Sequence, residues 1–281
     1  MKPEVLTTAA EVQARCAGLR RAGKRLALVP TMGFLHEGHL SLMREGGKRA
    51  EVVGASIFVN PTQFGPNEDL SRYPRDLEGD LEKCGSAGVQ LVYAPLPADV
   101  YPEGFQTFVQ VEKLELGLCG GKRPGHFRGV ATVVAKLFNI FRPDVALFGE
   151  KDFQQLRVLQ RLALDLNFGI EVVGMPIVRE PDGLALSSRN SYLSAEERRR
   201  ALALSMGLFA ARTLFEGGER DASRLRERVR AVLAGAGARE DYVELVDSTS
   251  LDPLERVDRA ARLLVAAFVG KTRLIDNLAL G

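Results

Sequence analysis

Short hydrophobic runs alternate with helix-like segments along the chain as far as residue 178. The runs are rich in Val, Leu, Ile and Ala, which favours buried strands. The predicted strands are 25–30, 52–60, 89–95, 145–149 and 170–178, and the predicted helices between them are 38–50, 75–87, 129–141 and 151–166. This alternation predicts a parallel α/β sheet, in which right-handed crossovers place helices on both faces.

The pattern changes near residue 180. A polar, turn-rich segment ends at 190, and a long helical stretch is predicted from Ser194, with Glu197 in the capping-box position. We therefore predict two domains, a Rossmann-like doubly wound parallel sheet domain at 1–177 and a smaller C-terminal α+β domain at 178–281. The second domain is predicted to contain a further helix at 221–234 and an antiparallel sheet of strands at 241–247, 262–269 and 272–278.

Composition narrows the class of protein. The 38 basic and 36 acidic residues leave a formal charge of +2, which gives no overall field toward nucleic acid or a membrane surface. The three cysteines, Cys16, Cys84 and Cys119, form no CxxC pair, so neither a disulfide framework nor a zinc knuckle is predicted. The N-terminal segment lacks the apolar core of a signal peptide, and no run approaches the ~20 apolar residues that span a bilayer. We expect a cytoplasmic protein that binds neither nucleic acid nor membrane.

Residues 30–39, PTMGFLHEGH, directly follow the first hydrophobic run and form the most informative segment. A buried strand that opens through glycines into a helix presents backbone N–H groups to a phosphate. His36 and His39 are three residues apart, so both lie around the first turn of a helix that begins near Gly38, at the positive end of its dipole. Two donors there could hold a triphosphate and neutralise charge that develops at its α-phosphorus.

Other interpretations of the two histidines stay open. Either histidine could cap or pack the helix instead of binding a ligand. The sequence HEGH also offers two imidazoles and a carboxylate to a metal, although the glycine beside the second histidine and the lack of a nearby Cys or Asp cluster disfavour zinc. The sequence does not identify metal ligands.

Polar side chains follow other strands of the predicted sheet. Gln63 follows the second strand, and Lys151, Asp152 and Gln155 follow the fourth. Ligands bind beyond the carboxyl ends of parallel strands, so we expect these side chains at the same rim as the histidines. The Lys151 ammonium can reach a phosphate oxygen or stay solvated, and Asp152 can equally serve as a helix N-cap. The two glutamine amides suit hydroxyl and carboxylate groups, although such amides are also common on surfaces.

Two further segments carry candidate binding residues. Ser187, Ser188 and Arg189 lie on a loop at the predicted domain junction, where the loop could close over a nucleotide. His126 lies among basic residues in the segment 122–129, KRPGHFRG. A lid for a polyanion and a packed turn both fit that position.

Seven motifs follow one another along nearly the whole chain. They are PTMGFLHEGH, SIFVNPTQF, RYPRD, RPGHFRGV, FGEKDFQQL, DGLALSSRN and LVAAFVGKTRLIDN. In this order they resemble the pantoate–β-alanine ligases, a family of the HxGH nucleotidyltransferase superfamily. HxGH alone would indicate only the superfamily, which includes the class I aminoacyl-tRNA synthetases.

The resemblance implies an ATP-dependent ligase of pantothenate and coenzyme A biosynthesis. In this family the carboxylate of (R)-pantoate attacks the α-phosphorus of ATP to give pantoyl adenylate and pyrophosphate. The amine of β-alanine then attacks the acyl carbon, which gives pantothenate and AMP. Magnesium accompanies the triphosphate, and the family is typically a homodimer through its nucleotide-binding domain.

The resemblance also implies site residues. His36, His39 and Lys151 would stabilise the adenylation transition state, with His39 as the proton donor. The implied ATP site comprises Pro30, Thr31, Met32, Gly33, Phe34, Leu35, His36, Glu37, Gly38, His39, Gly149, Glu150, Lys151, Asp152, Val178, Leu186, Ser187, Ser188 and Arg189.

The same resemblance implies which residues bind pantoate and β-alanine and which part of the chain closes over the site. Gln63 and Gln155 would hold pantoate, and Gln63 would also lie near β-alanine. Residues 178–281 would form a lid domain in which residues 186–189 are the counterpart of the KMSKS loop.

Two other functions stay open. An HxGH adenylyltransferase that retains AMP on its product would use the same site and release pyrophosphate without AMP. A non-catalytic RNA-binding protein descended from a synthetase-like fold would need a strongly basic face, which a charge of +2 does not favour.

Overall fold

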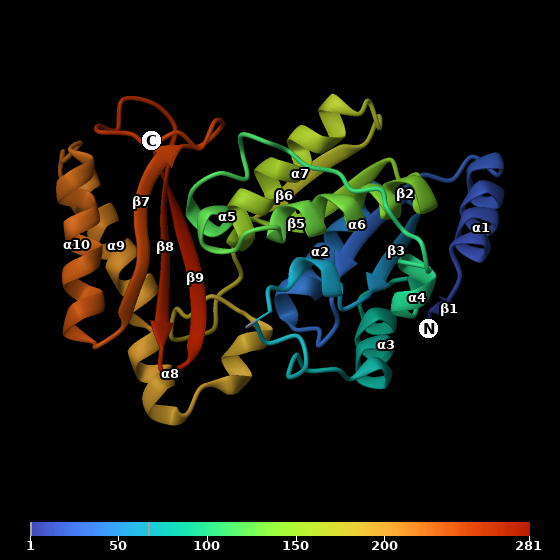
Figure 1. Cartoon of the computed structure of the whole chain (residues 1–281), viewed down its shortest axis with the longest axis horizontal. Coiled ribbons are helices and arrows are strands. Elements are labelled where there is room, and N and C mark those ends of the chain that lie inside the picture. Colours follow the sequence, from blue (N-terminus) through green and yellow to red (C-terminus); the bar gives the residue numbers. More distant parts are fainter. Residues whose placement is uncertain (1, 67) are drawn as a thin grey trace. The chain divides into compact units, whose positions relative to one another are not determined.

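A parallel sheet of six strands is the centre of the first part of the chain (Figure 1). The computed structural model describes residues 2–66 and 68–281. The strand order is β1-β4-β3-β2-β5-β6, and every neighbouring pair is parallel. The bounds are β1 Glu4–Leu6, β2 Leu26–Thr31, β3 Val52–Ile57, β4 Leu91–Tyr93, β5 Val145–Gly149 and β6 Glu171–Met175. The predicted parallel α/β sheet is confirmed.

Helices cover both faces of this sheet. Helices α2 and α3 pack on one face, where their apolar side chains meet those of Val53 and Ala55. Helix α6 packs on the other face, and the contact is so close that a Cβ at Gly54 would lie 2.8 Å from the Phe141 ring. The helices of this part are α1 Ala9–Arg21, α2 Glu37–Arg49, α3 Leu77–Ser86, α4 Pro97–Val100, α5 Leu118–Lys122, α6 His126–Phe141 and α7 Phe153–Asp165, with 3₁₀ turns η1 Pro61–Gln63 and η2 Glu150–Asp152.

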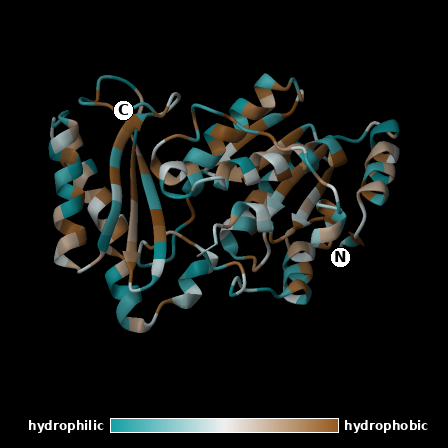
Figure 2. Cartoon of the chain, viewed as in Figure 1, coloured by the Kyte–Doolittle hydropathy of each residue, from teal (hydrophilic) through white to brown (hydrophobic). Residues whose placement is uncertain are grey.

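The C-terminal part contains an antiparallel sheet in the order β7-β8-β9. Its central strand β8 is almost uniformly hydrophobic in Figure 2. The helical stretch predicted from Ser194 is divided, because α8 ends at Ala201 and α9 begins at Ala203. The elements are η3 Ser188–Tyr192, α8 Ala195–Ala201, α9 Ala203–Glu216, α10 Ala222–Gly235, β7 Arg239–Asp247, β8 Ala261–Val269 and β9 Thr272–Leu280.

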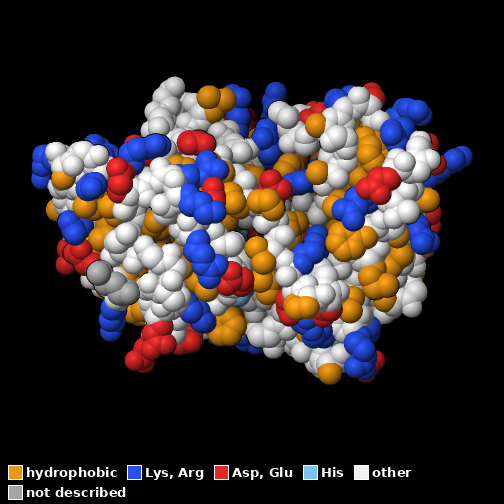
Figure 3. Space-filling view, turned by 180° about the vertical axis from the view of Figure 1, so that it is seen from behind, with side chains coloured by type: hydrophobic (Ala, Val, Ile, Leu, Met, Phe, Trp, Pro, Cys, Tyr) orange, Lys and Arg blue, Asp and Glu red, His pale blue; other side chains and the backbone are white. Residues whose placement is uncertain are grey.

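Surface charge is mixed in sign. Basic and acidic side chains are interspersed over the face shown in Figure 3. Among the described residues, no helix combines the length and the apolarity needed to cross a bilayer.

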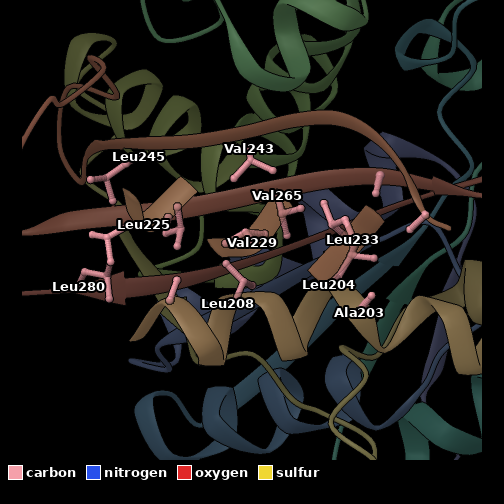
Figure 4. Close-up of a cluster of buried hydrophobic side chains, with 14 of the residues drawn as sticks. Ala203, Leu204, Leu208, Leu225, Val229, Leu233, Val243, Leu245, Val265 and Leu280 are labelled. Atoms are coloured by element: carbon pink, nitrogen blue, oxygen red, sulfur yellow. The ribbon is translucent and has the colours of Figure 1, made fainter. Parts of the chain in front are cut away.

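The core of the C-terminal part lies between its sheet and the helices α9 and α10 (Figure 4). Leu204 and Leu208 of α9 and Val229 of α10 are completely or almost completely buried against Val243 and Val265 of the sheet. A Cβ at Gly207 would lie 3.1 Å from Val229 Cγ1, so a glycine lets the two helices approach closely. This unit therefore has a hydrophobic core of its own.

The chain divides into two compact units at an unexpected place. The first unit comprises residues up to Glu150 together with Gln154–Pro176, and the second comprises Lys151–Phe153 and Ile177–Gly281. The Asn277 side chain donates a hydrogen bond to the Lys151 carbonyl at 2.9 Å, and the Arg262 guanidinium lies 4.0 Å from the Phe153 ring centre. Three residues of the predicted first domain, Lys151 among them, therefore pack in the second unit.

Candidate active site

The turn between β2 and α2 has an unusual backbone. Gly33 has a φ of +85° and Phe34 a φ of +51°, a left-handed conformation that favours glycine. A Cβ at Gly33 would lie 3.0 Å from Asp80 Oδ2 and 3.1 Å from Ile57 Cγ2. The Thr31 hydroxyl accepts the Gly33 N–H at 3.2 Å and donates to the Ser56 carbonyl at 2.7 Å. Strand β3 and helix α3 therefore fix the turn that leads to the two histidines.

Asp80 of α3 is the main support of that turn, and sequence analysis missed it. Its side chain is buried, and its two oxygens accept the N–H groups of Phe34 and Leu35, each at 2.7 Å. Burial raises the pKa of this carboxyl, although the two hydrogen bonds oppose the shift. The one sequence signal was an acidic residue on the apolar face of a predicted helix.

The two histidines lie together at the start of α2. His36 is the N-cap residue and His39 lies in the first turn, with ring centroids 4.1 Å apart. The His36 N–H donates to His39 Nδ1 at 3.3 Å. Because Nδ1 accepts this hydrogen bond, the ring proton of His39 is on Nε2, which makes Nε2–H a donor. The prediction that both histidines lie around the first turn of a helix is confirmed, and the helix begins at Glu37, one residue before the predicted Gly38.

Gln63 is in contact with the same segment. Its Nε2 donates to Met32 Sδ at 3.1 Å, and its Oε1 accepts from Asn60 Nδ2 at 3.0 Å. Asn60 is buried, and its Oδ1 accepts the Tyr101 hydroxyl at 2.7 Å. These contacts orient the Gln63 amide and leave it one N–H and acceptor capacity for a ligand. Asn60 and Tyr101 are further residues that were absent from the predicted site.

The two glutamines at the start of α7 have different environments. Gln154 is buried, accepts the Cys119 N–H at 2.9 Å and donates to the Leu114 carbonyl at 3.0 Å. Its amide is thus used in holding the segment before α5. The Gln155 side chain is half-buried and has no hydrogen-bond partner among the residues that the structure describes. Of the pair, Gln155 is the one available to a ligand.

The second unit brings Lys151 and the predicted loop together. Lys151, Ser187, Asn190 and Asp276 line one small hollow. The Lys151 side chain is 19% exposed, and its Nζ lies 3.8 Å from Asp152 Oδ2. An ammonium in this position keeps access to solvent or to an anion.

The loop that carries Ser187 is held by its own backbone. The Leu186 N–H donates to the Val178 carbonyl at 3.0 Å, so these two predicted residues are neighbours. Ser187 caps η3, where its hydroxyl accepts the Arg189 N–H at 3.3 Å. Ser188 is buried and Arg189 is half-buried.

The remaining predicted residues lie at strand ends and in the first turn of α2. Pro30 and Thr31 end β2, Gly149 ends β5, and Glu150 begins η2. Glu37 is exposed and paired with Arg44, and that hydrogen bond lowers the pKa of its carboxyl. Gly38 follows it inside α2. In residues 2–66 and 68–281, no three His, Cys, Asp or Glu side chains converge in a way that could hold a metal ion.

Comparison with known proteins covers the whole chain. A family model described as pantoate-beta-alanine ligase matches residues 4–279. A protein of Myxococcus xanthus named pantothenate synthetase is 65% identical over 100% of this chain and 97% of its own length. One of the same name from Anaeromyxobacter dehalogenans is 62% identical over 98% of each chain.

Solved structures agree with the sequence relatives. The crystal structure of pantothenate synthetase from Thermus thermophilus has a TM-score of 0.93 and 47% identity over 98% of each chain. A pantoate-beta-alanine ligase from Francisella tularensis, complexed with beta-gamma ATP and beta-alanine, has a TM-score of 0.81 and 31% identity over 98% of this chain and 97% of that one.

Proposed function

Because the chain belongs to the pantoate–β-alanine ligase family and joins pantoate to β-alanine, we propose that it uses ATP for this reaction and forms a pantoyl adenylate intermediate. The observation that carries the proposal is the contact of Gln63 with Met32, which places an amide suited to a carboxylate beside the turn that carries two imidazoles. The Francisella relative, complexed with beta-gamma ATP and beta-alanine, supports the choice of ATP as a substrate.

In the first step, a carboxylate oxygen of pantoate attacks the α-phosphorus. A P–O bond forms, and the bond to the bridging oxygen of the β-phosphate breaks, so that pyrophosphate leaves. The His39 Nε2–H donates toward the phosphoryl oxygens as charge develops there, and His36 adds a second polar group at the helix N-terminus. Lys151 acts on the same triphosphate as a point charge.

The two glutamines hold pantoate in this scheme. The Gln63 amide is held in place by its hydrogen bonds, and the Gln155 amide makes no hydrogen bond to a described residue. Carboxamides can both donate to a carboxylate and accept from a hydroxyl, the two groups that pantoate presents. Gln63 also binds β-alanine in the second step.

In the second step, the β-alanine amine attacks the acyl carbon of pantoyl adenylate. The C–N bond forms, the acyl C–O bond to the phosphate breaks, AMP leaves and the amine loses a proton. Water would destroy the mixed anhydride, so the site must be closed before the amine arrives. We assign this closure to residues 178–281 as a lid, with residues 186–189 in the role of the KMSKS loop.

Magnesium enters as the ATP complex in this proposal. Mg²⁺ commonly takes most of its ligands from substrate phosphates and water, with one or two carboxylates from the protein. An ion held in this way does not require a convergent set of three protein ligands, and the described residues contain no such set. The residues that contact the ion are not assigned.

We further propose a cytoplasmic homodimer formed through the nucleotide-binding unit. Strand β6 is an edge of the six-stranded sheet, and Leu164, which lines a hollow together with Val172 of β6, is 66% exposed. Light scattering of the purified protein should give twice the chain mass.

The cysteines are free and buried, and burial raises the pKa of Cys16 to about 11, so this thiol is protonated and inert.

ATP–pyrophosphate exchange tests the adenylate directly. Exchange should require pantoate and should not require β-alanine, and the complete reaction should release AMP and pyrophosphate in equal amounts. A folded protein that shows no pantoate-dependent exchange would contradict the adenylate. Release of pyrophosphate without AMP would instead indicate a transferase that retains AMP on its product.

A further inference from the structure

His126 lies in a buried polar network that connects the start of α6 to η1. Its Nδ1 lies 2.8 Å from the Gln63 carbonyl oxygen, and its Nε2 lies 3.0 Å from Arg123 Nη1. Arg123 in turn binds both carboxylate oxygens of Glu68, at 2.7 and 2.6 Å. The network thus joins two segments that are about sixty residues apart to the backbone of one proposed substrate-binding residue.

The contacts determine which ring nitrogen of His126 carries the proton. A guanidinium only donates hydrogen bonds, so His126 Nε2 must accept from Arg123. The ring proton is therefore on Nδ1, which donates to the Gln63 carbonyl. Glu68 compensates the charge of Arg123. Burial alone would raise the pKa of the Glu68 carboxyl, but the hydrogen bonds and charge of Arg123 outweigh burial and lower it.

The packing around η1 leaves little room for Gln63 to move. A Cβ at Gly129 would lie 2.4 Å from the Thr62 carbonyl oxygen, so the first turn of α6 lies directly against η1. The Gly129 carbonyl also accepts from Asn60 Nδ2 at 3.2 Å. Asn60 holds the Gln63 side chain, whereas His126 holds its backbone.

We propose that His126 is a positioning residue for pantoate, which acts by fixing the Gln63 backbone through its Nδ1–H. The inference rests on the proposed role of Gln63. A backbone held at the carbonyl and a side chain held at its oxygen leave the remaining amide N–H in one direction. Loss of the Nδ1–H donor therefore weakens pantoate binding and leaves ATP binding intact.

Two substitutions separate the two ring nitrogens. In His126→Asn, the side-chain amide occupies the place of Nδ1 and keeps a donor for the Gln63 carbonyl. In His126→Gln, the amide oxygen occupies the place of Nε2 and keeps an acceptor for Arg123, but nothing donates to Gln63. We expect the KM for pantoate to rise about tenfold in H126Q and to stay within about threefold of wild type in H126N, which corresponds to one hydrogen bond. The KM for ATP should stay within about twofold in both.

A control variant on the same helix tests whether a general loss of stability explains the change in KM. Thr132→Val removes two hydrogen bonds, one that its hydroxyl donates to the Arg128 carbonyl inside α6 and one that it accepts from the Val109 N–H outside the helix, and neither bond involves η1. It should lower the melting temperature as much as the His126 variants without a change in the KM for pantoate. If H126Q does not fold, His126→Ala carries the same test, because it also lacks the donor.

The outcomes distinguish the inference from the function on which it rests. Equal KM values for pantoate in H126N and H126Q, whether raised or unchanged, would overturn the role of His126, as would a KM for ATP that rises in parallel. Gln63→Ala is measured alongside. If that variant leaves the KM for pantoate unchanged, the proposed role of Gln63 fails; if it raises the KM and H126Q does not, only the positioning role fails.

Discussion

The two imidazoles at the start of α2 differ in their contacts, and this difference decides which one donates. His39 Nδ1 accepts the His36 N–H, so the ring proton of His39 is on Nε2. Substitution of His39 by Ala removes that donor from the developing phosphoryl charge. We expect pantoate-dependent ATP–pyrophosphate exchange to fall about a hundredfold or more, the effect of ~3 kcal/mol in the transition state. Near-wild-type exchange in the folded variant would rule out this role.

Lys151 is expected to show a loss of the same size. Lys151→Ala removes the positive charge that acts on the triphosphate, and adenylation should slow about a hundredfold. Lys151→Arg is the informative companion, since it keeps the charge with a different shape. If exchange in both variants is normal, Lys151 has no part in adenylation.

Asp80 is predicted to control activity without contact with substrate. In Asp80→Asn only one of the Phe34 and Leu35 N–H groups keeps an acceptor, and the new NH₂ group faces the other. The turn before His36 should shift, and exchange activity should fall about tenfold or more. The unfolding free energy should change by less than ~2 kcal/mol, because the unpaired N–H costs ~1–3 kcal/mol while the buried charge is removed.

A control on the same helix separates turn geometry from helix stability. Asp76 caps α3 and accepts the Gly79 N–H at 3.1 Å, whereas Asp80 accepts the N–H groups of the turn. Asp76→Ala should destabilise the helix by ~1 kcal/mol and leave exchange activity unchanged. If both aspartate variants lose activity equally, Asp80 acts only through the stability of α3.

Residues that carry chemistry were easier to predict than the residues that hold them. The histidine pair stood out because glycines and a strand framed it, and its place in the first turn is confirmed. Asp80 and Tyr101 come from segments that are distant in sequence from the residues they hold, and the place of Asp80 on the apolar face of a predicted helix did not show which N–H groups it binds. Asn60 is only three residues before Gln63, but its role depends on side-chain packing. His126 had two open interpretations, and the structure places it in a packed first turn of α6.

At the scale of elements, the contact of β9 with Lys151 has a direct consequence. Asn277 is 2% exposed and donates to the Lys151 carbonyl, so the C-terminal strand positions the backbone of this lysine. We expect Asn277→Ala to raise the KM for ATP about tenfold, with little change in the KM for pantoate. Steady-state kinetics with each substrate varied in turn measures this difference.

Arg273→Ala supplies the control for Asn277. Arg273 lies on the same strand and pairs with Asp241 of β7 at 2.9 Å, four residues from Asn277. Its loss should weaken the sheet and leave both KM values unchanged. A parallel rise of the two KM values in Asn277→Ala would mean that the strand acts on the whole fold and not on Lys151.

Element prediction succeeded where the hydrophobic pattern was continuous, and it missed strand β1 and helix α1, Ala9–Arg21, in which only Val12 and Cys16 are buried. The five predicted strands and four predicted helices of the first part all exist; strand 145–149 has the bounds of β5, and the others are shifted at one or both ends. Strand β1, Glu4–Leu6, is too short to show a pattern. Helix α6 begins at His126, because Gly125 supplies a left-handed residue just before it, with a φ of +82°. The break at Leu202 carries no glycine or proline, so nothing local predicted it.

At the scale of the whole molecule, the chain builds two separate cores, and the fold class followed from the change in pattern near residue 180. The assignment of Lys151–Phe153 to the second unit did not follow, since it depends on packing against β8 and β9. The boundary between 177 and 178 stays a prediction about domains that fold independently. Expression of the two parts separately would test it.

The acid stability of the second unit should depend on Asp247, which closes the connection from β7 to β8. Its Oδ1 accepts the N–H groups of Thr249 and Ser250 at 2.7 and 2.9 Å, and its Oδ2 accepts from Arg259 at 2.8 Å. The two backbone hydrogen bonds, together with Arg259, lower the pKa of this carboxyl from 3.8 to about 2. A lowered pKa in the folded state stabilises the fold above pH ~4, and this contribution disappears as the pH falls from about 4 to 2.

The variant Asp247→Asn isolates this effect, because it cannot titrate and keeps a similar shape. We expect it to be less stable than wild type at pH 6, with the difference in unfolding free energy decreasing to near zero at pH 2, as measured by denaturant titrations at several pH values. Asp258→Asn removes a more exposed carboxylate that contacts the same Arg259, and it should show no such convergence. A difference for Asp247→Asn that is constant across the pH range would show that the carboxylate charge of Asp247 does not stabilise the connection.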